Sequence, residues 1–301
     1  MKLSIIIPTY NRSEVLIKCL SAFFNQDYSK SQYEIIIVND GSTDNTEEKI
    51  KLFQKDNSQY FIRYFKQTNK GPAAARNLGV FKARGNIILF IGDDIIPAPH
   101  FLKEHDKIHR QYPNKNIAVL GYITWSQELK ITPFMFWLEN GGKQFSYYQL
   151  TPGGFTDYKH FYTSNISLKK LIFQKEKFNE NFPYAAHEDI EFGYRLQKRI
   201  GLKIFYHPKA KAFHLHKITL KSYAHRNLKA GVARAIFNKL QPEIAKYPVE
   251  SIKTKFVYNK LTIWFWMFVG QFYEKRKIKH RLFGRLCQYF YTKGFKSKIK
   301  S

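Results

Sequence analysis

The sequence of 301 residues has few of the features that define several large classes of protein. Its two cysteines, Cys19 and Cys287, have no CxxC neighbours, which argues against a disulfide framework or a zinc ribbon and fits a reducing compartment. No run of about 18 apolar residues occurs, so we expect no membrane-spanning helix. The turn after the first apolar run, residues 8–12, contains no glycine, which excludes the glycine-rich phosphate-binding turn of NAD-dependent enzymes.

Acidic residues are also scarce, because 23 Asp and Glu face 50 Lys and Arg, and the formal net charge is +27. A field of this sign attracts anions, so nucleic acid, an anionic membrane surface and a phosphorylated substrate are all compatible partners. A solvated, lysine-rich surface with no specific partner would give the same count. The hydrophobic share of 44% is sufficient for a large buried core.

Apolar runs and helical patterns alternate in the first third of the chain. The runs that are typical of strands are Leu3–Ile7, Glu34–Val38, Tyr60–Phe65 and Asn86–Ile91. Helical patterns begin near Ser13, Thr46 and Pro72. Repeated strand–helix units predict an α/β fold with an open, mostly parallel, doubly wound sheet.

The pattern is less regular after residue 115. We expect strands at Ile117–Trp125, Thr163–Leu168 and Leu202–Tyr206, helices at His187–Ile200 and Leu220–Lys239, and loops over the crevice at Thr132–Gly154. From residue 251 the chain is strongly basic, and Glu274 is its only acid. The 12-residue run Leu261–Phe272 is too short to cross a bilayer. It predicts either a buried core helix or an interfacial helix whose basic flanks meet anionic lipid.

Acidic side chains follow two of the predicted strands, at the edge where ligands of such sheets bind. Asp93 and Asp94 follow the fourth strand, and their carboxylates suit Mg²⁺ or Mn²⁺. Asp40 follows the second strand and has the acceptor oxygens that a base N–H requires. Turn formation and helix capping would account for the same residues without any ligand. We expect both acidic loops to face one crevice.

Two later segments carry further candidates. Glu188 and Asp189 open a predicted helix, where acids are favoured by the helix dipole, but where one carboxylate could also act as a general base. His214 and His216 alternate on an extended segment and so point to opposite faces, which leaves one of them free to face the crevice as a metal ligand. Which of the two histidines does so is open, and a lone histidine is more often structural.

Five segments together resemble the family 2 glycosyltransferases, which are inverting enzymes of the GT-A fold. They are SIIIPTYNR (4–12), EIIIVNDGSTD (34–44), NKGPAAARNLG (69–79), ILFIGDDIIP (88–97) and HEDIEFGYRLQKRIG (187–201). The resemblance covers about residues 3–240. It implies transfer of a sugar from a nucleotide diphosphate, with UDP-sugars as the default, to a hydroxyl of a glycan or lipid-linked acceptor in cell-surface polysaccharide synthesis.

The resemblance also implies roles for individual residues. The residues implied in donor binding are Pro8, Thr9, Tyr10, Asn11, Asp40, Lys70, Arg76, Asn77 and Asp93. Thr9 and Asp40 would contact the nucleobase of the donor, and Asp93 would contact the ribose region. Asp94 and His214 would hold the cofactor, Mn²⁺ or Mg²⁺, while Asp189 would be the catalytic base and Glu188 an acceptor contact. Many members have three acids where this chain has Gly92-Asp93-Asp94, so the first acid is missing and metal binding could be weaker.

The expected organisation is a GT-A domain at 1–240, divided into a nucleotide-binding half (1–115) and an acceptor-binding half (116–240), followed by a basic, aromatic helical extension (241–301). We expect a cytoplasmic protein that is peripheral on the inner face of the membrane and binds no specific nucleic acid. Two alternatives remain open at this point: a basic nucleic-acid-binding protein, and an inactive homologue that binds sugar nucleotides without transferring them.

Overall fold

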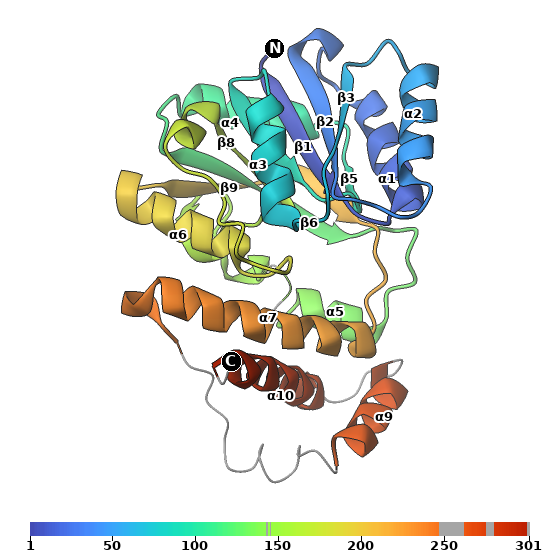
Figure 1. Ribbon diagram of the computed structural model, residues 1–301, viewed down its shortest axis with the longest axis vertical. Coiled ribbons are helices and arrows are strands. Elements are labelled where there is room, and N and C mark those ends of the chain that lie inside the picture. The colour runs from blue at the N-terminus through green and yellow to red at the C-terminus, as the bar shows by residue number, and fades with distance from the viewer. Residues whose placement is uncertain (143, 145, 247–261, 275–279, 300–301) are drawn as a thin grey trace. The chain divides into compact units, whose positions relative to one another are not determined.

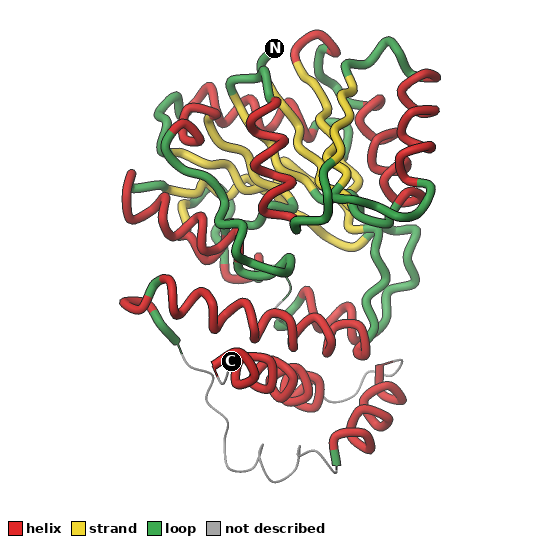
Figure 2. Tube along the Cα trace, in the orientation of Figure 1, coloured by secondary structure: helices red, strands yellow, loops and turns green. Residues whose placement is uncertain are grey.

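The computed structural model describes residues 1–142, 144, 146–246, 262–274 and 280–299. The chain divides into two compact units. The first comprises residues 1–128, 149–181 and 188–215, and the second comprises residues 129–148, 182–187 and 216–301. All the described strands belong to the first unit (Figure 2).

One mixed sheet forms the centre of the first unit. Its strands are β1 (Leu3–Thr9), β2 (Tyr33–Asn39), β3 (Ile62–Lys66), β4 (Ile87–Ile91), β5 (Ile95–Pro97), β6 (Ile117–Trp125), β7 (Phe155–Thr156), β8 (Asn165–Lys169) and β9 (Lys203–His214). They lie in the order β3-β2-β1-β4-β8-β6-β9-β5, and β7 pairs with β9. Strands β1, β2, β3, β4, β6 and β9 run one way, and β5, β7 and β8 run the other, which confirms the mostly parallel α/β sheet.

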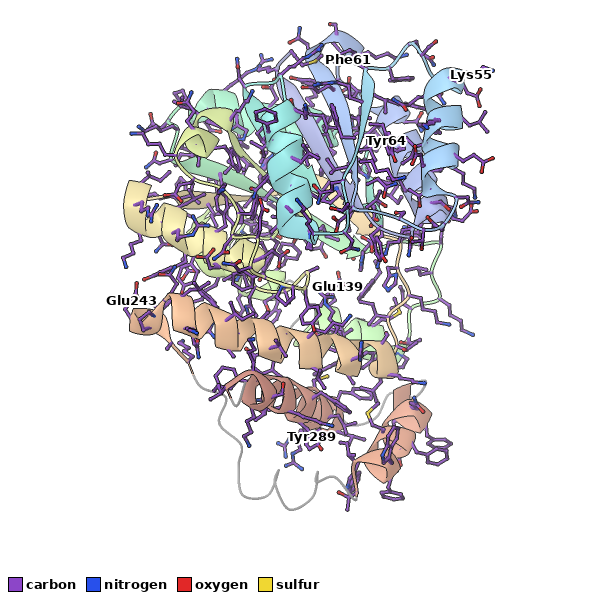
Figure 3. All side chains as sticks on the ribbon, viewed as in Figure 1. Lys55, Phe61, Tyr64, Glu139, Glu243 and Tyr289 are labelled. Atoms are coloured by element: carbon purple, nitrogen blue, oxygen red, sulfur yellow. The ribbon has the colours of Figure 1, made fainter. Side chains whose placement is uncertain are left out.

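The helices of the first unit are α1 (Ser13–Ala22), α2 (Thr46–Asp56), α3 (Pro72–Lys82), α4 (Phe101–Gln111) and α6 (Glu188–Ile200). Helix α3 packs on β1 and β2 and lies in front of them in Figure 1. Helix α2 is mostly polar, and Lys55 on it projects away from the sheet (Figure 3). Strands β1, β2 and β4 are buried almost throughout, as continuous apolar runs require when both faces of a sheet are covered.

Two predictions of secondary structure are wrong. Residues 132–154 are not all loop, because α5 (Pro133–Glu139) begins there, with the Thr132 hydroxyl accepting a hydrogen bond from the Met135 amide. The expected strand at 202–206 continues to His214. Pro208 cannot donate a ladder hydrogen bond, and the pairing of β9 with β6 shifts register around it, between Leu120 and Tyr122.

The second unit is helical in the residues described. It contains α5, α7 (Leu220–Leu240), α9 (Ile263–Glu274) and α10 (His280–Ile299). Helices α7 and α10 pack closely, because Gly231 and Gly294 carry no side chain at their crossing. Residues 129–148 and 216–240 group with these helices in the second unit. The proposed division into donor, acceptor and C-terminal segments stays a prediction.

Candidate active site

The candidate site forms where β1, β2 and β4 end at the same edge of the sheet. Thr9, the last residue of β1, lies beside Asn39 in the register of the parallel pair. Its backbone oxygen accepts a hydrogen bond from the Asp40 amide at 2.9 Å, and its hydroxyl donates to Asp93 Oδ2 at 2.8 Å. Thr9 therefore joins the two acidic loops, as the sequence predicts for strands that end at a common edge.

Asp93 and Asp94, which we call the acid pair, both form ion pairs with one arginine side chain. The guanidinium of Arg12 lies 3.2 Å from Asp93 Oδ1 and 2.6 Å from Asp94 Oδ2. Both carboxylates are buried. Burial and the adjacent charge of Asp94 raise the pKa of Asp93 to about 6. Arg12 is a residue that the sequence reasoning missed as a candidate, although it lies in the SIIIPTYNR segment.

His214 completes this cluster from the end of β9. Its Nε2 is 3.3 Å from Asp94 Oδ2, and its ring lies 5.3 Å from the ring of Trp125. Burial alone would raise the pKa of Asp94, but the hydrogen bond and charge of His214, together with Arg12, hold that pKa below its usual range. The backbone carbonyl of Asp94 also accepts a hydrogen bond from the Leu215 amide at 2.8 Å. Thus Asp94 and His214 do lie together.

A divalent cation would find two protein ligands here. Within the residues described, no three carboxylate, imidazole or thiol side chains surround a common point. Asp94 nevertheless offers the carboxylate oxygen that suits Mn²⁺ or Mg²⁺, and His214 faces it with a nitrogen donor. Such ions are commonly bound through one or two carboxylates, with the phosphates of a substrate completing the coordination. The donor set therefore fits a cation that arrives with a diphosphate.

Asp40 caps the start of α3. Its Oδ1 accepts hydrogen bonds from Gln67 Nε2 at 2.7 Å and the Lys70 amide at 2.9 Å, and its Oδ2 accepts from the Gly71 amide at 2.9 Å. Gly71 is the N-cap of α3, with φ of 87°. The carboxylate thus binds the amides of the N-cap residue and of the residue before it, and places a negative charge at the helix start. In the structure the contacts of Asp40 are those at the start of a helix. Its contact with the nucleobase of a donor stays a prediction.

Two asparagines of the implied donor set hold loops. Asn11 Oδ1 accepts from the Thr43 amide at 2.8 Å, and Asn77 binds both the amide and the carbonyl of Phe178 at 2.9 Å. The remaining predicted donor contacts, Pro8, Tyr10 and Lys70, are at least partly open to solvent, and Tyr10 is 45% exposed. Their position at the end of β1 and the start of α3 leaves them accessible to a ligand.

Arg76 on α3 and Glu188 at the start of α6 form a buried ion pair. Arg76 Nη1 lies 2.8 Å from Glu188 Oε1, and both residues are buried. Among the residues that the structure describes, Glu188 Oε2 and Arg76 Nε have no hydrogen-bond partner. A buried oxygen of this kind carries a desolvation cost that a ligand hydroxyl would remove. Because Arg76 belongs to the helix that Asp40 caps, this pair is connected to the acidic loops through α3.

Asp189 is the partly buried neighbour of that pair. Its Oδ1 accepts a hydrogen bond from the Ile190 amide at 2.8 Å, and its Oδ2 lies 3.4 Å from the Thr163 amide, a contact that sequence patterns did not reveal. Burial and the charge of Glu188 raise the pKa of Asp189 to about 7. A carboxylate that titrates near neutrality is suited to taking up a proton during a reaction.

Comparisons with known proteins agree with this architecture. A curated protein of Methanococcus voltae, dolichyl N-acetyl-alpha-D-glucosaminyl phosphate 3-beta-D-2,3-diacetamido-2,3-dideoxy-beta-D-glucuronosyltransferase, is 26% identical over 244 residues, which are 78% of this chain and 73% of the relative. Chondroitin synthase of Escherichia coli is 29% identical over 226 residues, which are 65% of this chain but only 32% of the relative. Rickettsia glycosyltransferases are matched over 13% to 19% of their length.

Solved structures share the GT-A fold at low identity. The mannosyltransferase PcManGT from Pyrobaculum calidifontis, in complex with GDP-Man and Mn²⁺, has a TM-score of 0.60 at 16% identity, over 82% of this chain and 66% of its own. S. aureus TarS 1–349 with UDP-GlcNAc has a TM-score of 0.57 at 14% identity, over 100% of this chain and 92% of its own. Residues 4–164, which carry both acidic loops, match the description "Glycosyl transferase family 2". The chain therefore belongs to glycosyl transferase family 2.

Proposed function

We propose that this glycosyltransferase moves a sugar from a nucleotide diphosphate, with a UDP-sugar favoured, to a hydroxyl of a glycan or lipid-linked acceptor in the synthesis of a cell-surface polysaccharide. The observation that carries the proposal is the connected set of contacts from the acid pair through Thr9, Asp40 and α3 to the Glu188–Asp189 pair. These contacts form a polar, partly buried site at the edge of the sheet. The acid pair would serve the diphosphate, and the Glu188–Asp189 pair would serve the nucleophile. A curated relative named as a glucuronosyltransferase of a dolichyl-linked sugar phosphate, and a solved structure in complex with UDP-GlcNAc, support the proposal.

The proposed reaction is a single displacement. Asp189 takes the proton from the acceptor hydroxyl, and the resulting oxygen attacks the anomeric carbon on the face opposite the diphosphate. The bond between that carbon and the phosphate oxygen breaks, the electron pair leaves with the diphosphate, and the configuration inverts. Glu188, fixed by Arg76, offers its free oxygen to the acceptor. Asp94 and His214 would hold Mn²⁺ or Mg²⁺, whose charge, when bound, stabilises the departing diphosphate.

Asp189→Asn tests the assignment of the base. The amide keeps the size of the side chain but cannot accept the proton, so we expect turnover to fall by about 10²- to 10⁴-fold. Binding of UDP in the presence of Mn²⁺ should change little, because Asp189 is not part of the acid pair. Release of nucleoside diphosphate across a panel of UDP-, GDP- and dTDP-sugars measures the turnover, and NMR of the product reports the anomeric configuration.

A matched control is Asp157→Asn, which changes a partly exposed carboxylate at the start of a 3₁₀ turn. That variant should retain wild-type turnover. Normal turnover of Asp189→Asn would remove the base assignment, whereas a product with retained configuration would remove the single displacement. If the wild-type protein binds UDP with Mn²⁺ but releases no diphosphate with any donor and acceptor, the inactive homologue is the better description.

We also propose that the protein is cytoplasmic and meets a lipid-linked acceptor at an anionic inner-membrane surface. No helix among the described residues combines the length and apolar character needed to cross a bilayer. On α9, however, the aromatic side chains that we call the α9 ridge are 50% to 80% exposed: Trp264, Phe265, Phe268 and Phe272. In the same unit, α10 exposes Arg281, Arg285, Lys293, Lys296 and Lys298. Exposed aromatics with basic neighbours suit a lipid interface.

The membrane proposal is tested with vesicles of phosphatidylglycerol, with phosphatidylcholine vesicles for comparison. The double variant Trp264→Ser/Phe268→Ser should lose most binding to anionic vesicles, because apolar insertion is removed while the charge is kept. Phe81→Ser is the control, since Phe81 is 78% exposed on α3, outside the α9 ridge. Undiminished binding of the double variant would refute insertion by the α9 ridge.

Random oligonucleotides separate this proposal from the alternative of nucleic-acid binding. If the wild-type protein binds them, with strong salt dependence, more tightly than anionic vesicles, that alternative gains support.

Part of the basic segment that the sequence predicts lies outside the described residues. This part comprises the basic positions Lys253, Lys255, Lys260, Lys275, Arg276, Lys277, Lys279 and Lys300, and the start of the apolar run at Leu261.

A further inference from the structure

Arg12 occupies the position between the two carboxylates of the acid pair. Its Nη1 atom contacts Asp93 Oδ1 and, more closely, Asp94 Oδ2. Within the residues described, the ion pairs that Asp93 and Asp94 form with lysine or arginine come from Arg12 alone. Two adjacent buried carboxylates repel each other, so the guanidinium stabilises an arrangement that would otherwise be unfavourable.

The oxygen that Arg12 holds is also the oxygen that faces the histidine. Asp94 Oδ2 lies 2.6 Å from Arg12 Nη1 and 3.3 Å from His214 Nε2. A divalent cation held by Asp94 and His214 would approach this same oxygen. Because a guanidinium and a divalent cation repel each other at such short range, both cannot share the oxygen in this geometry.

Arg12 has room to move away without disturbing the backbone. It is the N-cap residue of α1, and its carbonyl accepts a hydrogen bond from the Leu16 amide at 3.1 Å, so its main chain is fixed. Its side chain is 39% exposed, whereas Asp94 is buried. A guanidinium pairs with phosphate as readily as with carboxylate, often through two parallel hydrogen bonds.

We propose that Arg12 is a built-in counter-cation of the acid pair. It neutralises Asp93 and Asp94 before the donor arrives, and it exchanges these carboxylates for diphosphate oxygens when a divalent cation enters with the donor. The first half concerns the chain and the cation alone, and the second half rests on the proposed function. Arg12 would thereby weaken binding of the free cation and strengthen binding of the cation together with the diphosphate.

This double role predicts effects of opposite sign in one variant. For Arg12→Gln, Mn²⁺ alone, titrated by the EPR signal of free Mn²⁺, should bind more tightly, by about tenfold for the loss of one charged competitor. UDP in the presence of saturating Mn²⁺ should bind more weakly by a similar factor, measured by calorimetry. Arg12→Lys keeps the charge and should stay near the wild type for Mn²⁺ alone.

Arg110→Gln is the matched control, because Arg110 pairs with Asp106 on α4, outside the acid pair, and is 70% exposed. It should leave both affinities unchanged. Thermal unfolding with EDTA and with Mn²⁺ checks the fold, and the stabilisation by Mn²⁺ should be larger for Arg12→Gln than for the wild type. Mn²⁺ affinity that is unchanged or reduced in Arg12→Gln overturns the counter-cation role. Failure of the wild type to bind UDP with Mn²⁺ counts against the proposed function instead, because the comparison with Mn²⁺ alone remains valid.

Discussion

At the scale of single residues, Asp40 shows how one carboxylate connects strand and helix. It follows β2 and accepts three hydrogen bonds, two of them from the amides at the start of α3. The charge at the helix start is favourable, and the contact fixes where α3 begins. Because Arg76 lies on the same helix, the position of the Arg76–Glu188 pair depends on this cap.

The proposed base, Asp189, should make transfer depend on pH. Burial and the charge of Glu188 raise the pKa of Asp189 to about 7, and a base acts only when it is deprotonated. We therefore expect transfer to increase as pH rises through about 7, instead of staying level above pH 6 as it would for an ordinary aspartate. A profile of kcat/KM between pH 5.5 and 8.5 measures this limb.

Glu188→Gln provides a sharper form of the pH experiment. Removing the neighbouring negative charge should lower the pKa of Asp189, so the rising limb should move to lower pH even if the maximal rate falls. The assignment of Asp189 as the base is contradicted if kcat/KM of the wild type does not rise with pH. It is also contradicted if the rise occurs at the same pH in Glu188→Gln.

The location of these side chains was easier to predict than their partners. Asp40, Asp93 and Asp94 follow apolar runs that could only be buried strands, so their convergence could be expected from topology. Arg12 could not be found in this way. Its partners lie 81 and 82 positions away in the chain, and an arginine after a strand is compatible with many surface roles.

At the scale of elements, α7 and α10 depend on two glycines. A Cβ at Gly231 would lie 1.9 Å from the carbonyl oxygen of Tyr291, and one at Gly294 would lie 1.9 Å from that of Leu228. Tyr291 lies one helical turn before Phe295, on the same α10 surface. The labelled Tyr289 marks that helix in Figure 3. The two backbones therefore approach more closely than any side chain allows.

Gly231→Ala should force these helices apart. Overpacking at a tight contact costs about 1–3 kcal/mol, which exceeds the gain in helix propensity from alanine, about 1 kcal/mol. The free energy of unfolding, from urea titration followed by circular dichroism, should fall. Gly284→Ala on α10 is the control, since its nearest neighbour would be Trp137 at 3.8 Å, an ordinary contact. If Gly231→Ala is as stable as that control, the close approach is not limiting.

Elements were predicted well where the pattern of apolar residues is long and regular. The predicted strands of the first third differ from the observed ones only by small shifts in their ends, because continuous Ile- and Val-rich runs are typical of buried strands. Strand β5 was missed, since three residues carry no periodicity. The extension of β9 was missed because Pro208 interrupts its pattern, and α5 was missed because aromatic residues and glycines surround it.

At the scale of the whole molecule, a buried histidine network joins several parts of the first unit. His105 on α4 is within 2.8 Å of Ser167 Oγ and 2.9 Å of Asn165 Oδ1, both on β8. The amide nitrogen of Asn165 donates in turn to the carbonyls of Ala210 on β9 and Tyr122 on β6. Burial lowers the pKa of His105 to about 4, so the ring is neutral in the folded protein.

This network predicts sensitivity to acid. The unfolded chain binds a proton at a histidine near pH 6.5, whereas the folded chain resists protonation to about pH 4. The contribution of His105 to the free energy of unfolding is therefore fully present above pH 6.5. It is lost as pH falls from 6.5 to about 4, by up to about 3 kcal/mol. Urea titrations at pH 7 and pH 5 should show the loss, and His105→Gln should reduce the difference between the two values. Equal pH dependence in both proteins would contradict this source.

The route of the chain through the sheet has a consequence for synthesis on the ribosome. The residues after the acid pair form β5, which pairs with β9 at the far edge of the sheet, Ile95 opposite His214. Strands of the opposite edge can assemble as soon as they emerge, but β5 must wait for about 120 further residues to be translated. In a nascent chain, Asp93 and Asp94 are therefore synthesised about 120 residues before His214, and the candidate site is complete only after β9 has been translated.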